Sequence, residues 1–266
     1  MFVTSHHDAV LKQLGLGSLE QVRLFNGELI KNHRGRRDIL RIRTQDAGGR
    51  ELVLFLKRNW RPYKKDGLAS ILRHGRLRSM SRQEWENSHL LLDAGIATAR
   101  PAAFGEENGW LWEKFSFLLT EAASGSQTLA GFLKTCQDRA VRRRVFDALA
   151  LEVRRFHEAG FATPDLFTRH LFVEAGTAPP RFCWIDMARL DCQQPVSLRL
   201  RARDLAALNI TAPLRHVSTR ERLRFLRSYA GSRDRTLFRA IERRARYLLR
   251  RKKFHDFLAG HPSARA

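Results

Sequence analysis

The segment Glu51-Leu-Val-Leu-Phe-Leu-Lys57 is an apolar run that ends in a lysine. Such a run is typical of a buried strand. The earlier run Ile39-Leu-Arg-Ile42 predicts a second strand, and Gly48-Gly49 predicts the turn that joins the two. A lysine in this place is either a charge that protects a strand edge or a cation placed for binding. The helix that follows favours the second interpretation.

That helix carries two glutamates and is expected to end at Gly95. Its buried face is marked by residues at helical spacing, namely Trp85, Ser88, Leu91 and Leu92. Glu84 is the first candidate partner for Lys57, with Glu86 as the alternative. A strand lysine paired with a helix glutamate is how a kinase fold holds the phosphates of ATP. A solvated helix face explains either glutamate equally well in isolation.

Two aspartates in the second half of the chain stand where carboxylates can do chemistry. Residues 140–159 predict a long amphipathic helix, and Asp165 follows in the loop, within reach of a substrate hydroxyl. His170 comes five residues later, and Asp186 ends the short apolar run 182–185. Either aspartate alone is explained by ordinary capping or turn chemistry. Their order after Lys57 and Glu84 is what favours a kinase site.

Strand patterns precede helical patterns along the chain. Runs 102–105 and 115–120 predict further strands, whereas the pattern from Leu129 onward is mostly helical, with 182–185 as the exception. This order predicts an α+β protein with a β-rich N-terminal lobe and a mainly helical C-terminal lobe. We expect these lobes at 1–121 and 122–266, with a basic linker at 58–81 inside the first.

Charge is the unusual feature of the composition. The 266 residues include 49 Lys and Arg against 27 Asp and Glu, a formal net charge of +22. Residues 57–82 hold nine basic side chains and one acid, and residues 215–253 hold fifteen basic side chains and three acids. Such a field favours a nucleic acid, an anionic membrane or a phosphorylated glycolipid as partner. Nucleic acid is the least favoured because no nucleic-acid motif accompanies the charge.

The cysteines and the apolar runs indicate where the protein works. Cys136, Cys183 and Cys192 lack the spacing of a disulfide framework or a zinc site, which favours a reducing cytoplasm. The N-terminus does not resemble a signal peptide. No apolar stretch approaches the roughly 18 residues that a membrane span needs. We expect a cytoplasmic protein whose contact with the inner membrane, if any, is peripheral.

Taken together, these residues resemble the lipopolysaccharide kinases of the WaaP and InaA type, which have a protein-kinase-like fold of two lobes. The resemblance extends from about Val22 to Leu249. The matching segments are Arg36-Arg37, Phe55-Leu-Lys57, Gln83-Glu-Trp-Glu86, Asp93-Ala-Gly-Ile-Ala-Thr98, Phe104-Gly-Glu106, Ser116-Phe-Leu-Leu-Thr-Glu121, Phe156-His-Glu-Ala-Gly160, Asp165, His170-Leu-Phe172, Ile185-Asp-Met-Ala-Arg189, Arg203-Asp-Leu-Ala-Ala-Leu208 and Arg222-Leu-Arg-Phe-Leu-Arg-Ser-Tyr229.

The resemblance implies transfer of phosphate from ATP to a sugar hydroxyl, chiefly of heptose, in the lipopolysaccharide inner core or a lipid-A-linked oligosaccharide. It assigns ATP-phosphate binding to Lys57, orientation of that lysine to Glu84, and a hinge position beside the adenine to Glu121. It also makes Asp165 the catalytic residue that orients or deprotonates the hydroxyl.

The resemblance further assigns Mg²⁺ to Asp186 and His170. The histidine takes the place of the usual kinase asparagine and would also help to bind the nucleotide. Its metal role is the weaker one because Mg²⁺ prefers oxygen ligands.

One departure from the family pattern keeps alternatives open, and the glycine-poor loop bears on how they are weighed. Thr163-Pro164 stands where the family usually has His-Arg before the catalytic aspartate, and proline fixes the local φ. A catalytically weak or silent kinase-fold protein that binds anionic glycolipid or membrane is therefore one alternative. A protein kinase or another small-molecule kinase is a second. Gly27 and Gly35 do not form the glycine-rich loop of a protein kinase, which weakens that alternative.

Overall fold

A computed structural model describes residues 2–46, 48–60, 70, 71, 75, 77–110, 112–212, 215–232 and 234–251. Most of the expected basic linker, and Arg233, Lys252 and Lys253 of the basic C-terminal segment, lie outside the described residues. The chain divides into two compact units, Met1–Ala123 and Ser124–Ala266. The boundary expected from the sequence falls after Glu121, two residues before this division.

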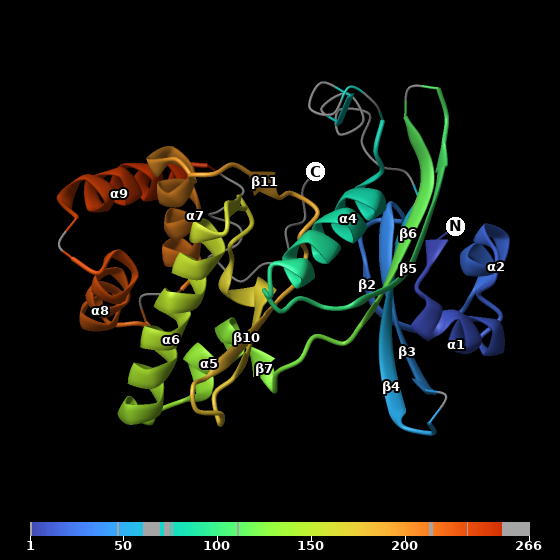
Figure 1. The fold of residues 1–266 in the computed structure, drawn as a ribbon, viewed down its shortest axis with the longest axis horizontal. Coiled ribbons are helices and arrows are strands. Elements are labelled where there is room, and N and C mark those ends of the chain that lie inside the picture. Colours follow the sequence, from blue (N-terminus) through green and yellow to red (C-terminus); the bar gives the residue numbers. More distant parts are fainter. Residues whose placement is uncertain are drawn as a thin grey trace. The chain divides into compact units, whose positions relative to one another are not determined.

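The first unit is built on a six-stranded antiparallel sheet with the order β1-β5-β6-β4-β3-β2 (Figure 1). Its strands are β1 (Phe2–Val3), β2 (Glu28–Asn32), β3 (Arg37–Gln45), β4 (Glu51–Asn59), β5 (Pro101–Asn108) and β6 (Glu113–Glu121). The expected hairpin is confirmed, because β3 pairs with β4 from Arg37↔Asn59 to Gln45↔Glu51. One detail was wrong: β4 does not end at Lys57 but continues to Asn59.

Helices cover both faces of this sheet. They are η1 (Ser5–His7), α1 (Asp8–Gln13), α2 (Leu19–Leu24) and α4 (Met80–Asp93). In Figure 1, α1 and α2 lie on one side of the sheet and α4 on the other. Leu54 and Leu56 of β4 join the core with α1 and α2. Because strand side chains alternate between faces, Lys57 points to the α4 side.

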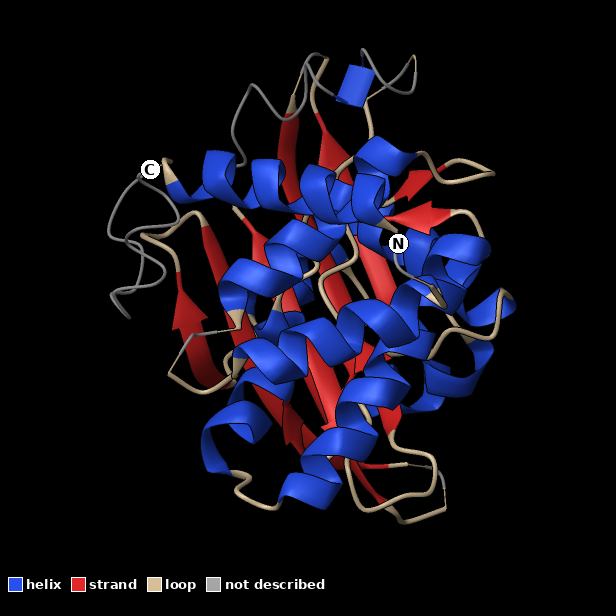
Figure 2. Cartoon of the chain, turned by 90° about the vertical axis from the view of Figure 1, so that its left-hand side faces the viewer, coloured by secondary structure: helices blue, strands red, loops and turns tan. Residues whose placement is uncertain are grey.

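The second unit is mainly helical, as Figure 2 shows for the face turned to the viewer. Its helices are α5 (Leu129–Thr135), α6 (Arg139–Glu158), the short η2 (Thr168–His170), α7 (Leu198–Thr211), α8 (Thr219–Ala230) and α9 (Arg235–Leu249). The expected helix at 140–159 is confirmed as α6. Gly160 follows it with a φ of 90°, which glycine adopts at no steric cost.

This unit also contains more strand than the sequence predicted. Its strands are β7 (Gln127–Thr128), β8 (Phe161–Ala162), β9 (Leu171–Glu174), β10 (Arg181–Trp184) and β11 (Asp191–Cys192). They form the sheets β10-β9-β7 and β11-β8. The interpretation of 182–185 as the only strand here was therefore wrong. Two-residue strands show no alternation, so they leave no periodic signal in the sequence.

Candidate active site

The first group of predicted site residues lies in the first unit, where Lys57 and Glu84 form an ion pair. The Lys57 ammonium donates to Oε1 of Glu84, and the two side chains are 13% and 8% exposed. Strand alternation aims Lys57 at α4, and Glu84 lies on the buried stripe of that helix with Ser81 and Ser88. The neighbouring Asn59 donates to Ser81 on the same side. The two elements are thus locked together around the pair.

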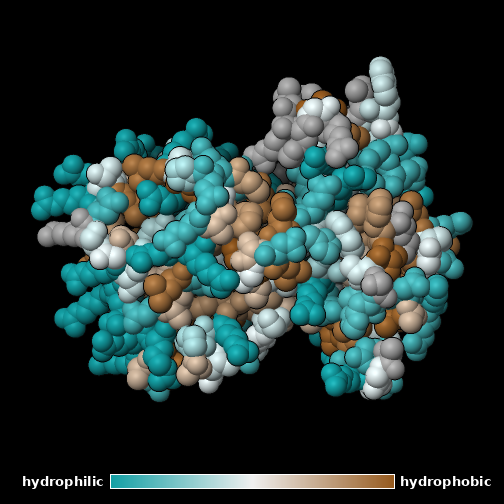
Figure 3. Space-filling view, in the orientation of Figure 1, coloured by the Kyte–Doolittle hydropathy of each residue, from teal (hydrophilic) through white to brown (hydrophobic). Residues whose placement is uncertain are grey.

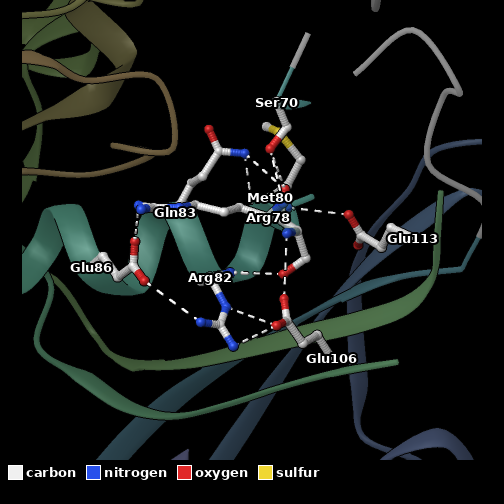
Figure 4. A network of polar contacts seen from close by, with 9 residues as sticks. Ser70, Arg78, Met80, Arg82, Gln83, Glu86, Glu106 and Glu113 are labelled. Atoms are coloured by element: carbon white, nitrogen blue, oxygen red, sulfur yellow. Dashed lines mark hydrogen bonds and ion pairs between the residues drawn. The ribbon is translucent and has the colours of Figure 1, made fainter. Parts of the chain in front are cut away.

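Glu86 is held elsewhere, which answers the question of Lys57's partner. Figure 4 shows its carboxylate turned toward Arg78 and Arg82, at 2.7 and 3.9 Å. Arg82 also donates to Glu106 of β5 at 2.7 Å. Burial alone would raise the pKa of Glu106, but the contacts with Ser79 and Arg82 outweigh it and lower the pKa below its usual value. These contacts fix the N-terminal turn of α4 to the sheet.

Glu121 ends β6 at the last residues of the first unit. Its carboxylate meets Nε2 of His7 at 2.9 Å, and burial lowers the pKa of that histidine although Glu121 opposes the effect. The backbone N–H of Ala122 donates to the carbonyl of Val53 at 2.8 Å. The Glu121 side chain is therefore engaged by the N-terminal segment, and a role beside adenine would fall to the backbone of this stretch.

The second group lies in the second unit and is organised by the loop around Asp165. The N–H of Asp165 donates to Oγ1 of Thr163 at 3.2 Å, and the N–H of Thr163 donates to Oδ2 of Asp204 at 2.6 Å. Asp204 is fully buried in α7. The carbonyl of Asp165 accepts from Nδ1 of His170 at 2.9 Å. Thr163, at the site of the family departure, thus anchors the loop through its backbone and hydroxyl.

His170 has a defined hydrogen-bonding state. Its Nδ1 donates to a carbonyl, and its Nε2 accepts from Nε of Arg169 at 3.1 Å. Burial lowers the pKa of His170, which favours the neutral ring despite the nearby Asp186 carboxylate. Nε2 lies 3.6 Å from Oδ2 of Asp186. The lone-pair side of the imidazole therefore faces the carboxylate that was predicted to hold metal.

Asp186 is one of two described non-glycine residues with positive φ, at 61°. Such a conformation costs free energy and tends to persist where the surrounding structure enforces it, often at functional sites. The N–H of Ile185 donates to the carbonyl of His170 at 2.9 Å, which ties the two segments together. The backbone is thus held so that the Asp186 and His170 side chains face each other.

The donor set suits Mg²⁺ only as a partial shell. Among the described residues, no group of three or more His, Cys, Asp and Glu side chains could hold a metal ion. Mg²⁺ in nucleotide sites commonly takes one or two carboxylates and completes its shell with phosphates and water. The Asp186 carboxylate, 34% exposed, fits that pattern as a single ligand, whereas both ring nitrogens of His170 are engaged, Nδ1 by the carbonyl of Asp165 and Nε2 by Arg169.

Sequence reasoning missed two residues that organise this group. Arg189 donates from Nε to Oδ2 of Asp165 at 2.6 Å and also from Nη2 to Oδ1. Asp204 accepts from Thr163 and from Arg203. In the sequence, Arg189 and Asp204 stand only as members of matching segments, with no role assigned to either. A signal existed for Arg189, since it is a cation three residues after Asp186.

Comparison with known proteins shows the family to which the chain belongs. The sequence model of the lipopolysaccharide kinase (Kdo/WaaP) family matches residues 20–229. The chain belongs to this family. The predicted class of enzyme, an ATP-dependent phosphotransferase, is thereby confirmed.

Relatives of this lipopolysaccharide kinase include enzymes with named acceptors. The lipopolysaccharide core heptose(I) kinase WaaP of Pseudomonas aeruginosa is 28% identical over 92% of this chain and 95% of its own length. The enzyme of the same name from Escherichia coli K12 is 26% identical over 82% and 83%. A solved structure of WaaP in complex with acyl carrier protein has 25% identity and a TM-score of 0.68, and covers 93% of this chain and 99% of that one. The predicted α+β, protein-kinase-like fold is confirmed.

Proposed function

We propose that this chain transfers the γ-phosphate of ATP to a heptose hydroxyl of the lipopolysaccharide inner core. The preformed Lys57–Glu84 ion pair carries the proposal, because phosphoryl transfer depends on a fixed cation at the nucleotide phosphates. The heptose acceptor is taken from the relatives of the chain. In this proposal Thr163 and Pro164 are compatible with activity, because Thr163 ties the loop to Asp204 and accepts from the N–H of Asp165.

In this proposal each residue has one task. Lys57 binds the α- and β-phosphates, and Glu84 keeps its ammonium in place. Asp165 orients the acceptor hydroxyl and takes its proton as the new O–P bond forms and the bond from Pγ to the ADP oxygen breaks. Asp186, with His170 beside it, would hold Mg²⁺, which offsets the charge of the transferring phosphate when bound. The backbone next to Glu121 would contact the adenine.

The test is γ-phosphate transfer by the purified chain to core oligosaccharide with and without heptose. We expect transfer only to the heptose-containing acceptor, and none in Asp165→Ala or Asp186→Ala. Glu158→Gln, an exposed acid at the end of α6, is the matched control and should keep full activity. ATP binding without transfer to any acceptor would favour the silent glycolipid-binding alternative. Transfer to a protein or a small molecule alone would favour the other kinase alternative.

We also propose that the protein works in the cytoplasm with peripheral contact to the inner membrane. None of the described helices is long and apolar enough to cross a bilayer. Trp110 and Trp112, in the turn between β5 and β6, are 92% and 45% exposed. Tryptophan prefers the membrane–water interface, and the +22 charge favours an anionic surface. The two tryptophans are therefore the proposed membrane contact.

An acyl carrier protein is a further proposed partner, because WaaP has been solved in complex with one. The second unit has an apolar cavity of about 610 Å³ lined by α5–α9 and a neighbouring groove of about 1060 Å³. Seven arginines line the groove: Arg139, Arg142, Arg143, Arg215, Arg220, Arg224 and Arg227. Leu133, Val217 and Leu223 line both spaces. An acidic carrier could bind the groove while its acyl chain enters the cavity.

The arginine groove supplies the test of this partner. Arg142 pairs with Glu221 and Arg224 pairs with Asp147. The exposed Arg143 and Arg220 form no ion pair among the described residues. Hydrophilic side chains project widely from this unit in Figure 3. We expect Arg143→Glu with Arg220→Glu to abolish co-purification of acyl carrier protein, and Arg181→Glu in β10 to leave it unchanged. Equal co-purification in all three proteins would contradict the proposal.

A further inference from the structure

Both oxygens of the Asp165 carboxylate are engaged by one guanidinium. Arg189 donates from Nε to Oδ2 at 2.6 Å and from Nη2 to Oδ1. Such a bidentate pair fixes the plane of a carboxylate as well as its position. The Asp165 side chain is 11% exposed and that of Arg189 is 50% exposed. The aspartate is thus enclosed, and the arginine closes over it from the solvent side.

The loop does not depend on this pair for its own shape. Thr163, Phe167 and His170 already bond the backbone of Asp165, through its N–H and its carbonyl. The hydrogen bonds that the structure gives to the Arg189 side chain, within the described part of the chain, all go to Asp165. Arg189 therefore acts on the carboxylate rather than on the fold.

The surroundings give this contact a chemical use. A carboxylate has about four lone-pair positions, so one bidentate arginine leaves each oxygen able to accept another hydrogen bond. The γ-phosphate and a phosphorylated acceptor are anions, and a bare carboxylate would repel both. The residues just before Asp165 are Thr163 and Pro164, which carry no charge. Arg189 is the cation that contacts the Asp165 carboxylate, and Arg169, which donates to His170, adds to the positive charge nearby.

We infer that Arg189 is a positioning residue for phosphoryl transfer. It holds the Asp165 carboxylate in the plane that presents a free lone pair to the acceptor hydroxyl, and it offsets the carboxylate charge as anions approach. Arg189 is not the proton acceptor, and its part in the reaction passes through Asp165. The inference rests on the proposed function, because it needs Asp165 to face the acceptor.

The test compares Arg189→Gln and Arg189→Lys with the wild type and with Arg181→Gln, an exposed arginine of β10. We expect Arg189→Gln to lower kcat by about ten- to a hundredfold, with KM for ATP within about twofold. Lysine should restore part of the loss, because it returns the charge without the bidentate fork. Arg181→Gln should match the wild type. The melting temperature of Arg189→Gln should stay near that of the wild type, since the replaced side chain is 50% exposed and glutamine can still donate to the Asp165 carboxylate.

The outcomes separate the two claims. A kcat for Arg189→Gln equal to that of the wild type would overturn the role of Arg189 and leave the proposed function intact. A fall in melting temperature without a fall in kcat would show a structural clamp instead. A wild-type chain that binds ATP but phosphorylates nothing would refute the proposed function, and the inference would fall with it. Added loss of kcat when Arg189→Gln is placed on Asp165→Asn would also count against it, because Arg189 then acts elsewhere.

Discussion

Lys57 and Glu84 lie 27 positions apart in the sequence and form an enclosed ion pair between β4 and α4. A charge in such a place is costly when its partner is removed, because water cannot replace the lost contact. The pair therefore serves two ends: it links the helix to the sheet, and it holds an ammonium in a fixed position.

Glu84→Gln and Glu86→Gln form a matched pair of variants two positions apart on α4. We expect Glu84→Gln to raise KM for ATP and to lower the free energy of unfolding by about 1–3 kcal/mol, since it leaves Lys57 without its counter-charge. Glu86→Gln breaks half-exposed contacts with Arg78 and Arg82 and should change KM little. Nucleotide titration and urea unfolding measure both effects. Equal KM values for the two variants would contradict the assignment.

Two replacements of Asp186 separate the backbone strain of its positive φ from the role of its carboxylate in phosphate transfer. Asp186→Ala and Asp186→Gly both remove the carboxylate, so neither should transfer phosphate. Alanine is strained at a φ of 61°, whereas glycine adopts it freely. We therefore expect the glycine variant to be more stable than the alanine variant by about 1 kcal/mol. Thermal unfolding of the two proteins checks this order, and a more stable alanine variant would mean that the backbone relaxes when the side chain is lost.

The extent to which the sequence predicts this site follows from how local each signal is. Lys57 was predictable because it ends an apolar run typical of a strand, and Glu84 and Glu86 because they lie in a segment with helical spacing. The choice between Glu84 and Glu86 needed the buried stripe of α4, on which Glu84 lies between Ser81 and Ser88. The lobe order and the long helix α6 were likewise visible.

The contacts around Asp165 were not predictable in the same way. Arg189 and Asp204 reach the loop from 24 and 41 positions further along the chain, measured from Asp165 and Thr163. No periodic pattern in the sequence encodes these long-range contacts, because they depend on the packing of α7 and on the loop after β10. The short pair of β8 and β11 is missed for the same reason, because its pairing partners are decided by tertiary structure.

The burial of Tyr229 predicts that the folded state loses stability at alkaline pH. Its hydroxyl lies 2.8 Å from Nδ1 of His157, and burial raises the pKa of Tyr229 to about 12. The unfolded chain has a tyrosine pKa near 10, so the folded state holds this proton more tightly. The contribution of about 2–3 kcal/mol is complete below pH 10 and is lost as the pH rises toward 12.

Tyr229→Phe isolates that contribution. We expect it to cost about 1 kcal/mol at pH 8 through the lost hydrogen bond, and to lose less stability than the wild type between pH 10 and 12. Tyr247→Phe, at a half-exposed position of α9, is the control and should follow the wild type across the range. Urea unfolding at a series of pH values gives the comparison. Parallel curves for the wild type and Tyr229→Phe would show that this proton does not contribute.

Trp110 and Trp112 should decide how tightly the protein binds anionic vesicles. Interfacial tryptophans add affinity through their amphipathic rings, whereas the +22 charge adds an attraction that salt screens. We expect Trp110→Ala with Trp112→Ala to weaken co-sedimentation with phosphatidylglycerol vesicles by about tenfold at 0.15 M salt. Neither the wild type nor this double variant should bind phosphatidylcholine vesicles appreciably. Leu24→Ala with Leu29→Ala is the matched control, because these side chains are 72% and 56% exposed on α2 and β2. If both double variants lost the same affinity, general surface hydrophobicity would explain the binding. If neither did, charge alone would hold the protein at the membrane, and the turn between β5 and β6 would not be the contact.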